Sequence, residues 1–526
     1  MEEKDRHLFQ FSAFNNLLPC VKVCLISSLI WGLLAHGVAL TTKFAVADEV
    51  HFGFSVGSTI VSGRWFLEIL GRFVRFFFGS PNFSLPLTGG LLTIFLTGLC
   101  SCTLAAWMEL KSKTSWVLVS GLMMTFPVMS GLFFYIFTSP YYMFGLLLLL
   151  LGSMILSKQR SWRAFGGGVI LVTLSISIYQ AFIPLFLSLL LTYFIKEVLC
   201  AEKWTVKILL REIFWYCSAC ITTILLYFLS VKLSTSLIQQ ELLPYKGISS
   251  MGTATISDYL YRIKLAIYLF FLPTRCDRYA FIFPYRLTDC YYLMLISTYL
   301  LGALLVLRTF KRNWVKSLSL LLVFAVFPLS ANFIYVMCEQ EDIYTLMQFG
   351  LLAPFLLLIC LADWQFFGHR LNKPIKECLC VFLCLFCLFC VRTDNAVYTK
   401  GIFVQTRAQS YFTTLVTQIK SVPGYTSATP VAYIGDTSIC MDPTFQRIDG
   451  FGALTMAPLP YDATPFCVGY DWQEFLHLWC GFAPVTASSE AFEILPEVQN
   501  MPSYPDSGSI RMIDGVVVVK FRESRS

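Results

Sequence analysis

The chain has 526 residues, of which 56% are hydrophobic, 16% aromatic and only 13% charged, with a mean hydropathy of +0.67 and a net charge of +7. This composition excludes a soluble globular protein of this length. Apolar stretches of roughly 17 to 25 residues recur along the first three quarters of the chain, and each is long enough to cross a bilayer as a helix. The sequence therefore predicts a polytopic α-helical membrane protein.

The first apolar run, residues 23–40, is followed by no small-residue cleavage pattern, so we expect it to be retained as a span. Lys and Arg then gather between alternate apolar runs, at residues 111–113, 158–163, 196–211, 308–316 and 369–376. Loops on the cytoplasmic side of a membrane collect basic residues. The N-terminus is thus predicted to be cytoplasmic, and residues 41–84 to form the first outer loop.

About eleven transmembrane helices are predicted in this way. The second and third apolar runs are 85–107 and 116–137, and a fourth ends at Lys158. Residues 166–194 are too long for one span and are expected to break near Tyr179-Gln180. The run at 212–233 leads to a second large outer loop, 234–285, in which residues 259–272 are apolar enough for an interfacial or re-entrant helix.

After the last apolar run, 378–391, the composition changes abruptly. Helical spacing at 407–419 and β-branched runs at 431–434 and 516–521 predict a small extracytoplasmic α/β domain over 392–526, beside a transmembrane domain over 1–391. Its cysteines are Cys440, Cys467 and Cys480, and two of them could pair in an oxidising compartment. Which two would pair does not follow from the sequence.

Several classes of function are disfavoured by missing patterns. The sequence has no P-loop, no dinucleotide-type glycine fingerprint and no nucleophile-elbow serine. The basic residues are explained by orientation and form no patch for nucleic acid. The histidines lack metal-ligand spacing, so we expect no metal or other cofactor, although a divalent cation stays open.

Candidate functional residues lie in the first outer loop. Asp48 and Glu49 could act as a general base on a hydroxyl, or could simply be solvated loop acids. Arg64, Arg72 and Arg75 are interleaved with aromatic and aliphatic residues over 65–78, a pattern typical of an amphipathic helix in contact with membrane lipid. Their guanidinium groups could bind a lipid phosphate, or could serve only as an anchor.

Further candidates follow at other outer positions. Tyr and Gln side chains at span ends could stack on and hydrogen-bond a sugar, although Tyr is also common at membrane interfaces; they are Tyr141, Tyr142, Tyr179 and Gln180. The second large outer loop adds cations for a phosphate, namely Arg262, Arg275 and Arg278. A second acidic cluster could supply the base or bind a metal instead, and consists of Glu339, Glu341 and Asp342. In the tail, Tyr433, Asp436 and Asp449 are candidates for acceptor recognition by position alone.

Taken together, these features resemble a known family. They are the first span with its outer acidic pair, the step Ser62-Gly63-Arg64-Trp65-Phe66, the break Ser177-Ile178-Tyr179-Gln180 and the start of the tail at 407–425. The chain resembles the bacterial serotype-converting O-antigen glucosyltransferases, of the Gtr type II kind, which belong to the GT-C superfamily of polytopic enzymes. The individual motifs are short, but they occur in the family's order.

The resemblance implies a bacterial inner-membrane enzyme. Such an enzyme would transfer glucose from undecaprenyl-phosphate glucose to lipid-linked O-antigen on the periplasmic face. By the same resemblance an acid in the first outer loop, here Asp48 or Glu49, would deprotonate the acceptor hydroxyl. Direct displacement with a single base would invert the anomeric carbon. The alternatives from other classes are an O-antigen ligase or polymerase, and a lipid or sugar transporter, for which midplane charges and internal repeats would be expected.

Overall fold

The structure is a computed structural model that describes residues 11–45, 47–51, 55–79, 84–243, 254–276, 280–339, 343–435 and 472–521. The chain divides into two compact units. The first contains Met1–Thr42 and Ser55–Asn395, and the second contains Lys43–Phe54 and Ala396–Ser526. The second unit thus begins near the expected boundary at 392, but it also takes up a short segment of the first outer loop.

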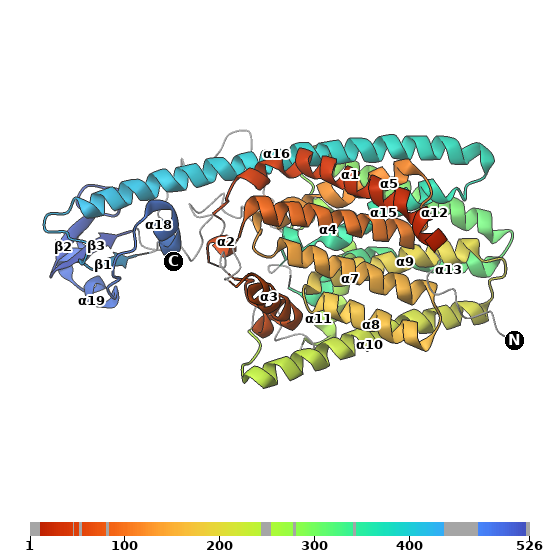
Figure 1. The fold of residues 1–526 in the computed structure, drawn as a ribbon, viewed down its shortest axis with the longest axis horizontal. Helices are drawn as coiled ribbons and strands as arrows, with labels where there is room; N and C mark the ends of the chain where they lie inside the picture. Colours follow the sequence, from red (N-terminus) through yellow and green to blue (C-terminus); the bar gives the residue numbers. More distant parts are fainter. Residues whose placement is uncertain are drawn as a thin grey trace. The chain divides into compact units, whose positions relative to one another are not determined.

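The first unit is helical. Its longer helices in chain order are α1 (Phe11–Thr41), α3 (Trp65–Phe78), α4 (Pro86–Trp107), α5 (Lys113–Thr125), α6 (Pro127–Phe134), α7 (Ser139–Lys158), α8 (Trp162–Ile176), α9 (Ile183–Cys200), α10 (Val206–Ile238), α11 (Ile256–Phe271), α12 (Arg286–Phe310), α13 (Trp314–Ala331) and α15 (Ala353–Trp364). Shorter turns are η1 (Ile60–Ser62), η2 (Gln180–Phe182), η3 (Pro273–Arg275), α14 (Ile334–Met337), η5 (Thr345–Met347) and η6 (Phe349–Leu352). Figure 1 shows α1, α4, α7, α8 and α10 side by side, in the order in which they contact one another.

Eight helices in the described part of the chain are long and apolar enough to cross a membrane. The pair α5 and α6, bent by 48° at Pro127, makes up to nine. Proline has no amide hydrogen and disfavours helix in the preceding residue, which accounts for the break. The predicted polytopic helical class is confirmed. The expected count of eleven is reached only if the shorter apolar helices α8 and α15 also cross.

Two glycines allow a close contact between helices α7 and α8. A Cβ on Gly152 would lie 2.8 Å from the carbonyl oxygen of Gly168, and one on Gly168 would lie 2.9 Å from that of Gly152. Helices α7 and α8 therefore touch backbone to backbone. Small residues allow such an approach, and in a membrane packing of this kind holds helices together where a hydrophobic driving force is lacking.

The predicted basic loops meet at one end of the first unit. Glu109, after α4, forms ion pairs with Lys158 of α7 at 3.4 Å and with Lys196 of α9 at 2.6 Å. Asp363, at the end of α15, accepts the backbone amide of Lys111 at 2.7 Å. Loops far apart in the sequence are thus joined directly, as expected if they share one side of a membrane.

The second unit contains a small sheet. Strand β3 (Val516–Lys520) lies between β1 (Val431–Ile434), which is parallel to it, and β2 (Ile510–Ile513), which is antiparallel. Both predicted strands are confirmed, while β2 was not predicted. The helices of this unit are α2 (Ala47–His51), α18 (Trp472–Cys480), α19 (Glu490–Glu493), α20 (Pro496–Gln499) and the last part of α16 (His369–Lys420).

The core of the second unit lies on both faces of β3. Val517 and Val519 pack with Phe412 and Leu415 of α16, whereas Val518 faces Val498 of α20. This alternation follows from the two-residue repeat of a strand. The predicted helix at 407–419 is present, but it is the end of the 52-residue helix α16, which continues from the last apolar run without a break.

Candidate functional site

The site is built around Arg64, at the start of α3. The 3-10 turn η1 ends at Ser62 and is followed by Gly63, which adopts a left-handed backbone conformation with φ +73°. Arg64 is the N-cap residue of α3. A Cβ on Gly63 would lie 2.5 Å from the hydroxyl of Tyr227 in α10. Glycine is therefore needed here for both its φ and the close approach of α10. The indole of Trp65 donates to Ser230 at 2.9 Å and ties α3 to the same helix.

Arg64 contacts three residues from two other parts of the chain. It donates to the hydroxyl of Tyr142 in α7 at 3.0 Å and to Oε1 of Gln180 at 3.5 Å. Its guanidinium carbon lies 5.4 Å from the centre of the Tyr179 ring, a cation–π distance. Tyr179 in turn stacks on Tyr142 with ring centroids 4.2 Å apart. These three partners are uncharged, and they orient the guanidinium.

A buried polar network fixes these side chains. Gln180 Nε2 donates to the carbonyl of Ser62 and to the hydroxyl of Tyr227, both at 2.9 Å. Tyr227 donates to the carbonyl of Gly63 at 3.3 Å, and Tyr179 donates to the carbonyl of Leu346 at 3.0 Å. Hydrogen bonds of this kind offset the free-energy cost of burying polar groups and fix their geometry. We call Arg64, Tyr142, Tyr179, Gln180 and Tyr227 the Arg64 cluster.

The Arg64 cluster lies at the opposite end of the helices from the basic loops. Tyr142 is in the first turn of α7, and that helix ends at Lys158 in the basic region. Gln180 lies just before α9, which reaches the same basic region at Lys196. A helix of this length spans about 30 Å, which is the thickness of the hydrocarbon core.

The other predicted arginines of the first loop lie along α3. Arg72 and Arg75 are exposed, and Arg72 pairs with Glu68 at 2.7 Å. Partial burial raises the pKa of Glu68, but hydrogen bonds from Arg72 and Thr59 outweigh burial, so its pKa lies below the usual value for glutamate. The amphipathic helix expected over 65–78 is observed, with Phe76, the most exposed of its phenylalanines, 86% exposed.

Asp48 and Glu49, the predicted base candidates, belong to the second unit. They lie in the first turn of α2, whose Val50 enters the core formed with Phe412. Glu49 is only 2% exposed and pairs with Lys43. Asp48 is half-buried. Of the two carboxylates, Asp48 is the more accessible.

In the described part of the second large predicted outer loop, Arg262 forms an ion pair. Arg262 in α11 donates to Glu339 at 3.1 Å, which joins two groups predicted separately, the loop cations and the alternative acidic cluster. Helix α11 is the expected interfacial helix and begins with a capping box between Thr255 and Asp258. Arg275 is exposed in η3.

Other predicted residues are placed as follows. Tyr141 is half-buried next to Tyr142. In the second unit, Tyr433 packs edge-on against Trp472 with ring centroids 4.7 Å apart. Seven residues named in the predictions lie outside the described part of the chain: Arg278, Glu341, Asp342, Asp436, Cys440, Asp449 and Cys467. Within the described part, no three His, Cys, Asp or Glu side chains are grouped as metal ligands.

Two site features were not predicted. The sequence places Tyr227 in an apolar run. A tyrosine near the end of such a run is only a weak signal for a polar contact. Asp394 was assigned to the outer tail, but it is a fully buried residue of the first unit. Its carboxylate oxygens accept no hydrogen bond from the residues that the structure describes.

The fold and the Arg64 cluster define a polytopic helical membrane protein with an oriented arginine at one end of its helices. The glucosyl transferase GtrII family matches residues 37–355, which is more than half of the chain and includes the whole Arg64 cluster. The chain belongs to this family, and so to the membrane glycosyltransferases. Comparisons with curated proteins and with solved structures return no match.

Proposed function

We propose that the protein transfers glucose from undecaprenyl-phosphate glucose to lipid-linked O-antigen, on the periplasmic face of the bacterial inner membrane and with inversion at the anomeric carbon. The observation that carries the proposal is the Arg64 cluster, which presents an oriented cation within the region matched by the family.

The proposed orientation rests on the two ends of the first unit. The basic loops gather at one end, through contacts such as that of Lys196 with Glu109, and the positive-inside rule assigns that end to the cytoplasm. The Arg64 cluster is at the other end of α7 and α9 and would then face the periplasm.

In the proposed step, Arg64 binds the phosphate of the donor. The acceptor hydroxyl oxygen attacks C1 of glucose, the bond between C1 and the phosphate oxygen breaks, and undecaprenyl phosphate leaves with the electron pair. Negative charge on the leaving phosphate is stabilised by a guanidinium that is already oriented. Tyr142 and Gln180 act here as positioning residues, because they hold Arg64. Tyr141, which is half-buried beside this cluster, would contact the sugar.

The proposed base is Asp48, which would take the proton of the acceptor hydroxyl. Its partial exposure favours it over Glu49, whose carboxylate is buried and engaged with Lys43. Because Arg64 supplies positive charge for the leaving group, we propose that no metal ion is needed. Loss of transfer on treatment with EDTA, restored by Mg²⁺ or Mn²⁺, would contradict that part of the proposal.

The test is glucose transfer by purified protein in proteoliposomes, with undecaprenyl-phosphate glucose as donor and lipid-linked O-antigen as acceptor. Asp48→Asn is expected to lower the transfer rate by about 10²- to 10⁴-fold, the usual contribution of a general base. Donor binding should be retained. The matched control is Asp289→Asn, which removes a 65% exposed acid paired with Arg286.

The Glu49→Gln variant tests whether Glu49 acts as the base in place of Asp48. It removes the partner of Lys43 and is expected to lower thermal stability more than the rate of the folded enzyme. Full activity of Asp48→Asn together with a large rate loss in folded Glu49→Gln would move the base to Glu49. No transfer by the wild-type protein would contradict the proposed donor and acceptor.

A further inference from the structure

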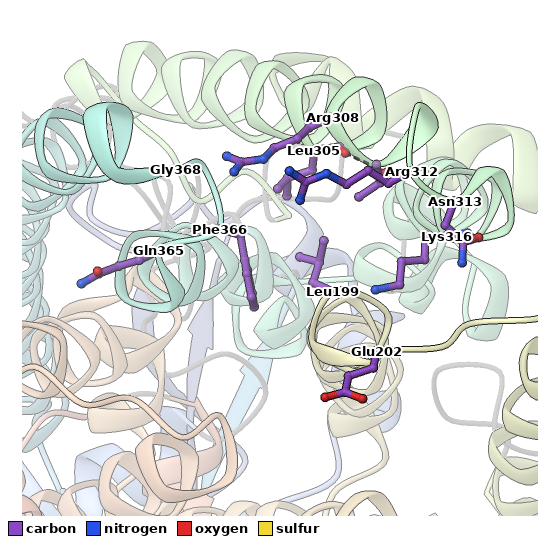
Figure 2. A pocket seen from close by; sticks show the side chains of 11 residues that line it. Leu199, Glu202, Leu305, Arg308, Arg312, Asn313, Lys316, Gln365, Phe366 and Gly368 are labelled. Atoms are coloured by element: carbon purple, nitrogen blue, oxygen red, sulfur yellow. Dashed lines mark hydrogen bonds between the residues drawn. The ribbon is translucent and has the colours of Figure 1, made fainter.

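A basic pocket lies at the end of the first unit that contains the basic loops. Its walls come from the ends of α9, α12 and α15, from the start of α13, and from the loops between them, and its volume is about 510 Å³. This is within the range of small-molecule sites, roughly 300 to 1,000 Å³. Figure 2 shows the side chains that line it.

Three cations converge on this pocket. Arg308 and Arg312 point toward the same space, and the Lys316 side chain extends toward it from α13 (Figure 2). The carboxylate of Glu202, at the opposite rim, points away from the two guanidinium groups. Within the described residues, none of the three cations forms an ion pair, and Lys316 donates to the carbonyl of Ala201.

Cations of the neighbouring basic loops, in contrast, form ion pairs within the protein. Arg160 pairs with Glu197 at 2.7 Å and with Glu212 at 2.6 Å, and Lys196 pairs with Glu109. Those charges are satisfied inside the protein. Topology and the dipole at the C-terminal end of α12 account for basic residues at this end, but neither requires three cations to face one concave space.

Part of the pocket wall is apolar. Leu199, Leu305 and Phe366 line it, beside the polar side chains of Glu202, Thr309, Asn313 and Gln365. An anionic head beside an apolar wall matches a phospholipid better than a fully solvated anion. Basic pockets between transmembrane helices on the cytoplasmic side bind anionic lipid head groups in this way.

We propose that this pocket binds the phosphate of an anionic phospholipid, with Arg308 and Arg312 as its principal ligands. Two forked guanidinium groups can bind phosphate oxygens in pairs, and Lys316 adds a third positive charge. The site is separate from the Arg64 cluster and does not depend on the proposed transfer reaction. The ligand is a phosphodiester lipid whose acyl chains lie along the apolar part of the wall.

The experiment is native mass spectrometry of the full-length protein in detergent, with dioleoyl phosphatidylglycerol, dioleoyl phosphatidylcholine and inorganic phosphate as separate probes. Wild-type protein is expected to retain phosphatidylglycerol at least tenfold more strongly than phosphatidylcholine. The Arg308→Gln/Arg312→Gln double variant is expected to lose that preference. Lys311→Gln, which changes a cation of the same loop outside the pocket lining, should keep it.

Two outcomes would overturn the proposal. One is an unchanged preference for phosphatidylglycerol in the folded double variant. The other is saturation by inorganic phosphate that depends on Arg308 and Arg312 while phosphatidylglycerol shows no such dependence, which would assign the pocket to a soluble phosphate. If the glutamine variant does not fold, Arg308→Lys/Arg312→Lys keeps the charge but not the fork, and a several-fold loss of affinity is expected.

Discussion

At the residue scale, Gly63 and Tyr227 form a matched pair. The hydroxyl of Tyr227 occupies the space where any other residue at position 63 would place its Cβ, and it also accepts the Gln180 amide. The same hydroxyl is therefore both a steric limit and a hydrogen-bond partner. Removing this hydroxyl and adding a Cβ at position 63 should therefore have non-additive effects on the free energy of unfolding.

Gly63→Ala is expected to cost about 2 to 3 kcal/mol, because it adds strain at a positive φ and a contact with the Tyr227 hydroxyl. Tyr227→Phe alone should cost about 1 kcal/mol for its lost hydrogen bonds. In the double variant the contact is gone, so the combined loss should be smaller than the sum. Unfolding in mild detergent measures this, with Tyr261→Phe, 63% exposed, as the control. Additive losses would contradict the steric account.

Glu68 makes stability depend on pH. Because its pKa is lower in the folded protein than in the unfolded chain, its contribution is fully present above the unfolded pKa and is lost as pH falls through the folded pKa. Glu68→Gln should therefore be less stable than the wild type at pH 7, and the difference should shrink as pH falls below the model-peptide value of 4.5. Unfolding of both proteins between pH 7 and about pH 3 tests this. A difference that is constant with pH would contradict it.

At the element scale, α3 has an apolar face that the described protein does not cover. Phe73, Phe77 and Phe78 are 61%, 73% and 74% exposed, while Leu67 is buried. An amphipathic helix with arginines on its polar side is suited to the membrane interface. Arg64 is the N-cap residue of this helix, so contact of α3 with lipid would influence the position of Arg64.

A photo-crosslinking residue in place of Phe77 should therefore capture phospholipid. The side chain is long, exposed and on the apolar face, and substitution there removes no contact that buries it. The same crosslinker in place of Phe355, which is fully buried, should capture protein only. Mass analysis of the adducts distinguishes the two. Capture of water alone at position 77 would show that α3 does not lie in the interface.

Several elements could be predicted from local sequence. The break at Tyr179-Gln180, the amphipathic helix after Arg64 and the strand at 431–434 all follow from short patterns of polar, aromatic or β-branched residues. The continuity of α16 could not be predicted in the same way. Polar residues from Arg392 onward ended the apolar run, but helix propensity does not depend on hydropathy, and the helix continues to Lys420.

At the scale of the whole molecule, the proposed orientation rests on the distribution of charge. Reporter fusions test it directly. Alkaline phosphatase fused after Ser526 is expected to be active, because the sequence places the tail outside, and the same enzyme inserted at Lys311 is expected to be inactive. A fluorescent protein that folds only in the cytoplasm should give the reverse pattern. Activity at Lys311 would invert the topology and place the Arg64 cluster in the cytoplasm.

The candidate site was predictable only in part. The sequence singles out Tyr142, Tyr179 and Gln180 at predicted outer ends of spans and Arg64 in the first predicted outer loop, and the structure brings these four together. The contacts of Arg64 with Tyr142 and with Gln180 link positions 78 and 116 residues apart, which no local pattern reveals. Tyr227 was missed for that reason. Arg72 and Arg75 were equally good candidates by sequence, but the structure leaves them exposed on α3.

The central claim is that Arg64 binds the donor phosphate during glucosyl transfer. The most direct test is kcat/KM for undecaprenyl-phosphate glucose in Arg64→Gln, with Arg286→Gln as the control because that arginine is 80% exposed and paired only at the surface. The account predicts a loss of about 10²- to 10³-fold in Arg64→Gln, as for removal of one group that stabilises transition-state charge. It predicts a partial loss in Arg64→Lys and no more than a twofold change in the control. A folded Arg64→Gln variant with wild-type kcat/KM would contradict the claim.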